Sequence, residues 1–311
     1  MKASGAPTVE HRRAIALIGL LVLIWGFNWP INKVILTYIS PLWFACLRLV
    51  LGAISLFLVQ TFQADGIKLP ARRDLPVVFS IGLVQMAAVL ALMTLGLADV
   101  PAGRSAILSY TTPLWVVPGS VLILGERPGL GRSMALLLGL AGVVFLFNPV
   151  GFDWGNRKEV IGNGYLLAAA MLWAASIIHV RAHRWIGTPL ALAPWQMLVG
   201  VIPLLALARS FEGPPPHLGF SVGTTLLALY SGPLITAFPF WAVITVARAL
   251  PALTTSLTLL LVPVLGLVSS ALLLSEPMNA TLIIGLSLIV SAVAAVSMAE
   301  TKQAPPSKDV G

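Results

Sequence analysis

Charged residues are scarce in this sequence of 311 residues, and the few that occur lie mostly between long apolar runs. Only 10% of the residues are Asp, Glu, Lys or Arg, whereas 58% are hydrophobic and the mean hydropathy is +0.95. Soluble domains carry about 25% charged residues. The composition therefore excludes an ordinary soluble domain and indicates a protein that lies in a membrane.

Cysteine and histidine are also rare, which limits the chemistry that the chain can perform. The single cysteine, Cys46, can form neither an intramolecular disulfide nor a thiolate metal site. The four histidines are scattered, and none has the spacing of zinc ligands. We therefore expect no metal site and no cofactor. An enzyme would need clustered carboxylates or histidines, and the sequence shows no such cluster.

Acidic residues are absent from the middle of the apolar runs. No Asp or Glu occurs between Glu10 and Asp65, and Glu126 and Glu276 fall at the ends of apolar runs. We expect Glu126 and Glu276 to cap or brace the helices that follow them. The net charge of +8 comes from basic residues between the runs, where Lys and Arg determine orientation in a bilayer. We therefore expect a lipid bilayer around the protein and no nucleic-acid partner.

Charged and turn residues divide the chain into ten apolar segments of about 18 to 25 residues, each long enough to cross the roughly 30 Å of hydrocarbon as a helix. With the N-terminus placed inside, thirteen Lys and Arg fall inside and five outside, so both termini are expected in the cytoplasm. The prediction is an all-α, multi-pass protein of the cell inner membrane, ending in a disordered tail at 299–311. The segments lie near 14–36, 42–60, 75–97, 101–123, 131–148, 161–180, 189–208, 222–247, 251–273 and 279–298.

The two halves of the chain resemble one another when it is folded at about residue 150. Because each half holds five spans, the second half would enter the membrane inverted. We thus predict an N-terminal repeat at 1–150 and an inverted repeat at 151–298, an arrangement typical of transporters that expose one site alternately to the two sides. At a constant offset of 150, Pro101, Pro113 and Glu126 fall opposite Pro251, Pro263 and Glu276.

Three motifs carry a resemblance to a known family: "WGFNWPINK" (25–33), "PLWFACLRLVLG" (41–52) and the paired "GERP" (125–128) and "SEP" (275–277). With these motifs in this order within ten expected spans, the sequence resembles the drug/metabolite transporter superfamily, in particular its ten-helix EamA-type members. The resemblance implies transport of amino acids, other small metabolites or drugs, and the layout is most similar to amino-acid exporters. The first span lacks the buried carboxylate that small relatives in this superfamily use to exchange protons for cationic drugs.

The first span carries a polar stripe. Trp25, Asn28 and Asn32 share one face of the expected helix, and that face should point into the bundle because polar groups in lipid are costly. Asn28 either contacts the substrate or bonds a neighbouring helix, and we expect the second role for Asn32. Pro30 leaves a carbonyl near Gly26 without its amide partner, which would suit a hinge or a carbonyl ligand.

Two cations lie in the first two spans. Lys33 either attracts a substrate carboxylate, as its place in the family's motif implies, or extends its stem to the interface. Arg48 has no acidic residue near it in sequence, and we expect it to bond helix-end carbonyls of its own half.

Hydroxyl and aromatic side chains in the middle of spans complete the candidate site. Hydroxyls precede a proline in the fourth and ninth segments, where they either line the site or satisfy carbonyls that the proline frees. Mid-span aromatics would suit an apolar or aromatic cargo, with core packing as the alternative. The predicted substrate-binding residues are Trp25, Asn28, Lys33, Gln85, Ser109, Tyr110, Trp173, Ser176, Phe238, Trp241 and Thr258, and the predicted hinges are Pro30, Pro113 and Pro263.

Together these features predict a secondary transporter that exports small metabolites, with amino acids bearing apolar or aromatic side chains as the expected cargo. A sugar-phosphate, nucleotide-sugar or drug carrier of the same superfamily is one alternative, although the phosphate-bearing cargoes would need more mid-membrane cations than Arg48 supplies. An integral membrane enzyme acting on lipid is the alternative from another class. We expect a monomer whose small residues bring helices together within one chain.

Overall fold

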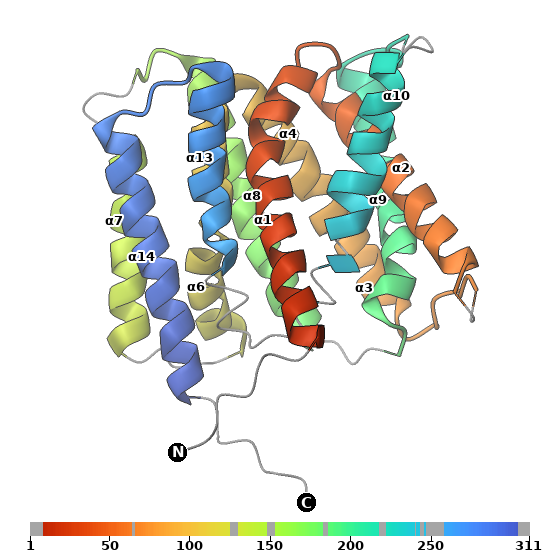
Figure 1. Cartoon of the computed structure of the whole chain (residues 1–311), viewed down its shortest axis with the longest axis horizontal. Helices are drawn as coiled ribbons and strands as arrows, with labels where there is room; N and C mark the ends of the chain where they lie inside the picture. The colour runs from red at the N-terminus through yellow and green to blue at the C-terminus, as the bar shows by residue number, and fades with distance from the viewer. Residues whose placement is uncertain are drawn as a thin grey trace, which may run out of the picture.

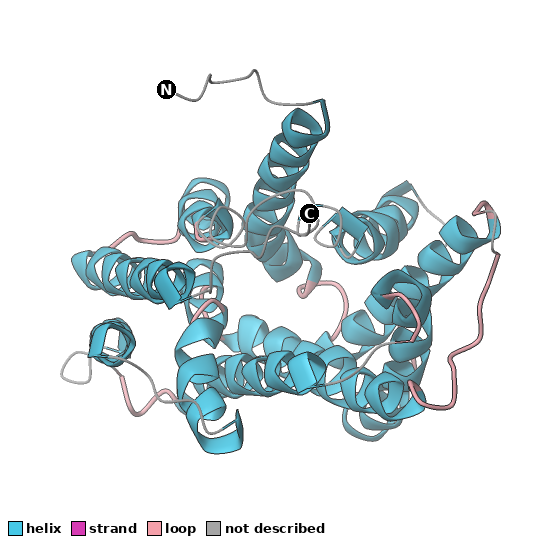
Figure 2. Ribbon diagram, turned by 90° about the horizontal axis from the view of Figure 1, so that it is seen from below, coloured by secondary structure: helices cyan, strands magenta, loops and turns pink. Residues whose placement is uncertain are grey.

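The computed structural model describes residues 9–63, 66–124, 130–147, 153–182, 186–217, 222–239, 241–242, 246 and 258–303. These residues form helices joined by short connections, and no strand occurs among them. The prediction of an all-α protein is confirmed for this part of the chain. Figure 1 shows the helices standing side by side, and Figure 2 shows the same bundle from below.

Helices occupy all five apolar segments that were predicted in the first half. The third segment is one continuous run whose middle is π-helical, and the fourth is interrupted by a turn at Tyr110 and Thr111. The elements are α1 (Val9–Ile35), α2 (Pro41–Thr61), α3 (Leu75–Ser80), η1 (Ile81–Val89), α4 (Leu90–Asp99), α5 (Ala102–Ser109), α6 (Thr112–Leu124) and α7 (Leu130–Phe147).

The second half has the same kinds of element, with part of its eighth and ninth segments outside the described residues. A π-helical stretch again follows a short α-helix, and the last helix extends beyond the predicted end at residue 298. The elements are α8 (Arg157–Ala182), α9 (Pro189–Phe211), α10 (Val222–Leu229), η2 (Tyr230–Ala237), α13 (Leu261–Leu274) and α14 (Ala280–Gln303).

The two predicted hinge prolines of the fourth and ninth segments lie at the beginnings of helices. Pro113 is the second residue of α6, and Pro263 is the third residue of α13. A proline is tolerated in the first turn because the amide that it lacks would have no intrahelical partner there. Each proline thus lies in the first turn of a helix and does not bend the middle of one. A hinge at either position stays a prediction.

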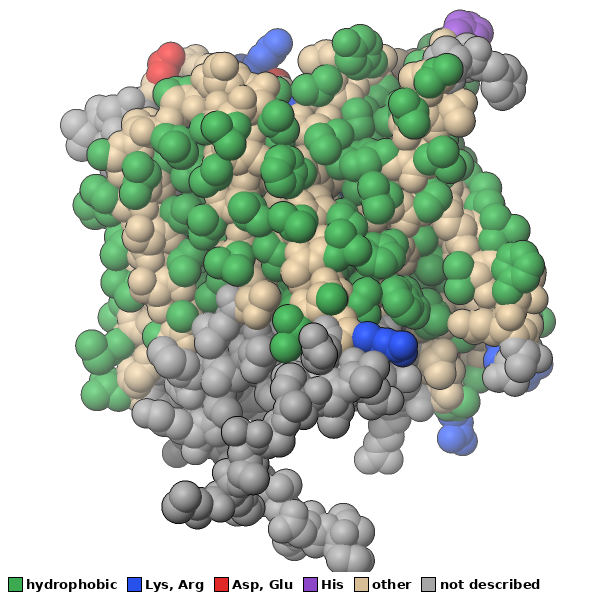
Figure 3. All heavy atoms as spheres, in the orientation of Figure 1, with side chains coloured by type: hydrophobic (Ala, Val, Ile, Leu, Met, Phe, Trp, Pro, Cys, Tyr) green, Lys and Arg blue, Asp and Glu red, His purple; other side chains and the backbone are tan. Residues whose placement is uncertain are grey.

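Five helical stretches are long and apolar enough to cross a membrane by length and composition, while the other apolar helices described are shorter. Ten membrane crossings therefore stay a prediction. Hydrophobic side chains cover the middle of the face seen in Figure 3, with Lys and Arg toward its upper and lower edges and Asp and Glu at its upper edge. This distribution suits a bilayer, because the hydrocarbon offers charged groups no water. The five stretches are Arg13–Ile35, Pro41–Thr61, Leu75–Asp99, Arg157–His179 and Leu190–Phe211.

Helices from the two predicted halves pack against one another. Helix α1 packs on α13, α2 on α9 and η2, α4 on α8, and α7 on α14. Helix α1 begins and α14 ends at the lower face of the bundle in Figure 1. We name this the terminal face and the opposite one the far face. The assignment of the terminal face to the cytoplasm stays a prediction.

Candidate functional site

The inner stripe of α1 is less tightly packed around the two residues predicted to bind substrate. Leu21 and Asn32, at the ends of this stripe, are only 1% and 3% exposed. Trp25 and Asn28 lie between them on the same face, yet both are half-buried. The helix packing therefore leaves these two side chains partly exposed.

Asn28 meets a side chain of the second half. The Tyr230 hydroxyl, at the start of η2, donates a hydrogen bond of 3.1 Å to Oδ1 of Asn28. This bond joins residues that are 202 positions apart in the sequence. Of the two roles considered for Asn28, the bond to a neighbouring helix is therefore present. A contact of Asn28 with substrate stays a prediction.

Arg48 of α2 lies beside the same tyrosine. Its guanidinium interacts electrostatically with the Tyr230 hydroxyl, and its Cζ lies 5.8 Å from the centre of the Phe44 ring. Nε of Arg48 is buried and has no hydrogen-bond partner. In the described chain Arg48 makes none of the expected bonds to helix-end carbonyls. Arg48 as a whole is half-buried, and a cation inside a membrane span with no anion among the described residues is costly, so this side chain needs an explanation.

Two glycines bring α2 and η2 together near Arg48. A Cβ atom added to Gly232 would meet the Cβ of Leu51 and would lie 2.9 Å from the Leu51 carbonyl oxygen. A Cβ on Gly52 would lie 2.6 Å from Cγ2 of Thr236. Only glycine permits such approaches, which place the α2 backbone directly against η2.

The π-helical segments occupy corresponding positions in the two halves. Segment η1 includes Gly82 and Gln85, and η2 includes Gly232, which lies 150 residues after Gly82. In η2 the Thr236 hydroxyl donates to the carbonyl of Ser231, five residues earlier, at 2.7 Å. Short π-helical insertions occur frequently at functional sites because they redirect the side chains around them. Gln85 is half-buried there.

The carbonyl that Pro30 leaves free is occupied. Helix α1 continues through Pro30, and the Ser269 hydroxyl of α13 donates to the carbonyl oxygen of Gly26 at 3.0 Å. The same hydroxyl lies 3.2 Å from the carbonyl of Gly266 in its own helix. The carbonyl of Gly26 thus ties α1 to α13, and a hinge at Pro30 stays a prediction.

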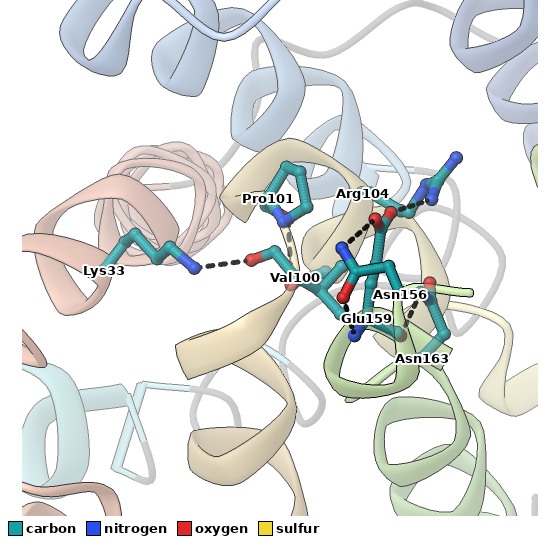
Figure 4. Close-up of polar contacts among 8 residues, drawn as sticks. Lys33, Val100, Pro101, Arg104, Asn156, Glu159 and Asn163 are labelled. Atoms are coloured by element: carbon teal, nitrogen blue, oxygen red, sulfur yellow. Dashed lines mark hydrogen bonds and ion pairs between the residues drawn. The ribbon is translucent and has the colours of Figure 1, made fainter. Parts of the chain in front are cut away.

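Lys33 holds the end of α4. Its Nζ donates to the carbonyl oxygens of Leu97, Ala98 and Val100 at 2.6, 2.8 and 2.9 Å, and Figure 4 shows it reaching Val100. An ammonium group has three donors, and a cation at a helix C-terminus is stabilised by the helix dipole. In this conformation the three donors are engaged, so binding of a substrate by Lys33 would require another arrangement.

Glu276 holds the start of α5, on the other side of the same corner. The amides of Ala102 and Gly103 donate to its two carboxylate oxygens at 2.6 and 2.9 Å. The prediction that Glu276 caps the following helix is wrong, because Oδ1 of Asn279 accepts from the Leu282 amide there. Glu126 lies outside the described residues.

Other carboxylates bind helix ends across the two halves. Glu159, near the start of α8, accepts from Arg104 of α5 at 2.7 Å, as Figure 4 shows. Glu212 and Asp74 likewise accept from residues of the other predicted half. Backbone amides of Leu42 and Trp43 donate to Glu212 at 2.9 and 3.1 Å, and those of Ile186 and Gly187 donate to Asp74 at 3.2 and 2.7 Å.

The hydroxyls predicted to line the site differ in their surroundings. Ser109 is 7% exposed, and its Oγ has no hydrogen-bond partner. Ser176 donates to the carbonyl of Leu172 in its own helix at 3.0 Å, which is an intrahelical role. Thr258 is half-buried and lies just before α13.

The predicted aromatic residues are spread over the bundle. Tyr110 packs against the buried cluster that contains Trp29. The rings of Phe238 and Trp241 lie 5.8 Å apart, but Trp241 is 39% exposed, and Phe238 packs near the start of α1. Trp173 is half-buried. The described contacts link none of these residues to Asn28.

The list of predicted site residues included neither Tyr230 nor Arg48. The signal for Arg48 was present, because an ionisable residue inside a membrane span suggests a functional site by default. Tyr230 is one of several mid-span aromatic residues in the sequence, and its contact with Asn28 depends on the packing of η2 against α1.

Comparison with known proteins supports the family resemblance that the sequence motifs indicated. The model of the EamA-like transporter family matches residues 12–148 and 160–298. The uncharacterized transporter YoaV of Bacillus subtilis is 28% identical over 88% of this chain and 93% of its own. An Escherichia coli protein named a probable amino-acid metabolite efflux pump is 27% identical over 88% and 90%. A crystal structure with 20% identity covers 94% of this chain and 98% of its own at a TM-score of 0.61, which supports the fold. The chain belongs to the EamA-like transporter family.

Proposed function

We propose that the protein is a secondary transporter that exports amino acids with apolar or aromatic side chains. The proposed position of the site rests on the hydrogen bond between Tyr230 and Asn28. It connects the two halves at the level where Trp25 and Asn28 remain partly accessible. Transporters built from repeats place their substrate between the repeats.

Alternating access between two inverted halves is the proposed mechanism. The family model matches the chain in two segments, 12–148 and 160–298, and π-helical segments occur at corresponding positions in both. Both observations support repeats at 1–150 and 151–298. Access to the site would change when the repeats move relative to one another.

Polar contacts at the two faces are candidates for the closing contacts. At the far face, Lys33 and Glu276 hold the corner at 97–103 from two sides. At the terminal face, Asp74 holds the residues before α9. In the proposed cycle one of these sets loosens while the other stays intact, so that the site never opens to both faces together.

The proposed cargo rests on the site and on a relative. Trp25 shares a face of α1 with Asn28, and Tyr230 bonds Asn28, and the aromatic rings of these two residues suit an apolar or aromatic side chain. The Escherichia coli relative named an amino-acid metabolite efflux pump supports amino acids as the class. We further propose that the protein acts as a monomer in the cell inner membrane.

Counterflow in proteoliposomes tests this function. Purified protein would be reconstituted, loaded with each of the twenty amino acids in turn, and assayed for uptake of the labelled amino acid with and without a pH gradient. We expect counterflow of apolar and aromatic amino acids, with Asn28→Ala reducing the rate about tenfold or more. Phe27→Ala, on the exposed side of α1, is the matched control and should keep the rate. No counterflow of any amino acid by the unaltered protein would refute the proposed cargo.

A further inference from the structure

We infer that Arg48 binds a carboxylate of the transported molecule, beside the hydroxyl of Tyr230. This inference rests on the proposed function, since it assigns the chemical class that the same site recognises. The cargo would be a monoanionic carboxylate or a zwitterion, held by the guanidinium at its carboxyl end.

The first argument is that Arg48 has no anion among the described residues. Nε of Arg48 is buried without a hydrogen-bond partner, and no ion pair joins Arg48 to a carboxylate of the described residues. The ring of Phe44 offers a cation–π contact at 5.8 Å, which leaves the Nε–H donor of the guanidinium without an acceptor. Arginine in a membrane span is normally paired or faces a water-filled cavity.

The second argument is the neighbourhood. The hydroxyls of Tyr230 and Ser231 both lie at the start of η2, and the Ser231 hydroxyl is buried without a partner. The close approach at Gly52 and Gly232 holds α2 against this segment. A carboxylate has two oxygens that accept paired hydrogen bonds from a guanidinium fork, and a nearby hydroxyl can donate a further one.

The third argument concerns the charge of the cargo. Two other cations near the far face are already compensated within the protein, because Lys33 donates to three carbonyls and Arg104 pairs with Glu159. Arg48 lies inside α2 and, unlike the exposed Arg209 at the end of α9, it is half-buried without such a partner among the described residues. One uncompensated positive charge matches a carboxylate and does not match the dianion of a sugar phosphate.

The inference is tested by binding to the full-length protein in nanodiscs, measured by isothermal titration calorimetry. The probes are 3-phenylpropionate and 4-methylpentanoate, which carry a carboxylate without an amine, and 3-phenylpropylamine, which carries an amine without a carboxylate. The proteins are the unaltered chain, Arg48→Gln, Arg48→Lys and the control Arg209→Gln, whose arginine is exposed at the end of α9.

We expect the unaltered chain and Arg209→Gln to bind at least one carboxylate probe, and Arg48→Gln to bind it about tenfold more weakly or worse. Binding of the amine should not change between these proteins. Arg48→Lys keeps the charge but loses the fork, so an intermediate loss is expected. If Arg48→Gln does not fold, the Arg48→Lys result decides, and an unchanged Kd for the carboxylates would overturn the inference.

The outcomes separate the inference from the proposed function. If Arg48→Gln binds the carboxylates as the unaltered chain does, or if the unaltered chain binds neither carboxylate, the inference is wrong even when amino-acid counterflow is present. If counterflow of every amino acid is absent but carboxylate binding depends on Arg48, the proposed cargo fails and the inference stands.

Discussion

The hydroxyl of Ser269 donates a hydrogen bond of 3.0 Å to the carbonyl oxygen of Gly26, the acceptor that Pro30 leaves without an amide. A Cβ on Gly26 would lie 2.6 Å from the Cβ of Leu265, so the two helices are in close contact here. The bond is buried, and an unpaired carbonyl in this position would be destabilising. The proline and the serine therefore act as a pair, although they lie in different halves.

This pair predicts non-additive effects on stability. Ser269→Ala should lower the free energy of unfolding by about 0.6 to 1.5 kcal/mol. In a Pro30→Ala background the loss should nearly disappear, because the new amide of residue 30 can bond the Gly26 carbonyl. The measurement is equilibrium unfolding in mixed micelles for the four proteins of the cycle.

The control for this cycle is Ser270→Ala. The Ser270 hydroxyl is also buried but donates to the carbonyl of Gly266 in its own helix, so its effect should not depend on Pro30. Equal losses for Ser269→Ala with and without the proline would show that the interhelical bond contributes nothing.

Lys33 should contribute to the stability of the folded protein. Lys33→Met removes three hydrogen bonds to the end of α4. We expect this change to lower the free energy of unfolding by about 1 to 3 kcal/mol, with little change in the KM of a transported amino acid. Unfolding and counterflow would be measured on the same preparation. Lys158→Met, at an exposed position in the first turn of α8, is the matched control. A raised KM with unchanged stability would instead favour the predicted role of Lys33 in substrate binding.

Glu276 should protect the start of α5 from hydrogen exchange. Glu276→Ala leaves the amides of Ala102 and Gly103 without their acceptors, so exchange at the start of α5 should accelerate by about tenfold. Mass spectrometry of peptides that begin before Ala102 measures this. In the control Asp153→Ala, a carboxylate that bonds the Gly155 amide in an exposed turn is removed instead, and exchange at α5 should not change. Unchanged exchange in Glu276→Ala would argue against the cap.

Gly232→Ala should separate α2 from η2. The new methyl group would meet Leu51, including its backbone at 2.8 to 2.9 Å, and the backbone cannot move aside as a side chain can. We expect a loss of about 1 to 3 kcal/mol in stability and slower counterflow, because Arg48 and Tyr230 would lose their relative position. Gly19→Ala is the control, since nothing lies within 4 Å of the added atom there. Counterflow at the unaltered rate in Gly232→Ala would show that this contact does not position the site.

Much of the fold could be predicted from the sequence because it depends on local signals. Apolar runs and their charged or turn-forming boundaries placed helices within a few residues of those observed, as α2 at Pro41–Thr61 and α9 at Pro189–Phe211 illustrate. The face shared by Trp25, Asn28 and Asn32 follows from the helical period alone. The sequence analysis predicted continuous apolar helices at 75–97 and 222–247 and did not predict the π-helical segments η1 and η2 within them.

The sequence by itself determined that this is a helical membrane protein with a polar stripe in its first span and the motifs of a transporter family. The tertiary structure decided what the polar groups do. Glu276 bonds amides 173 and 174 positions away, Lys33 bonds carbonyls of α4, and Arg48 has no anion among the residues that the structure describes. A charged group in a membrane bonds whichever partner the packing of the helices brings within reach, and that packing joins residues from opposite halves of the chain.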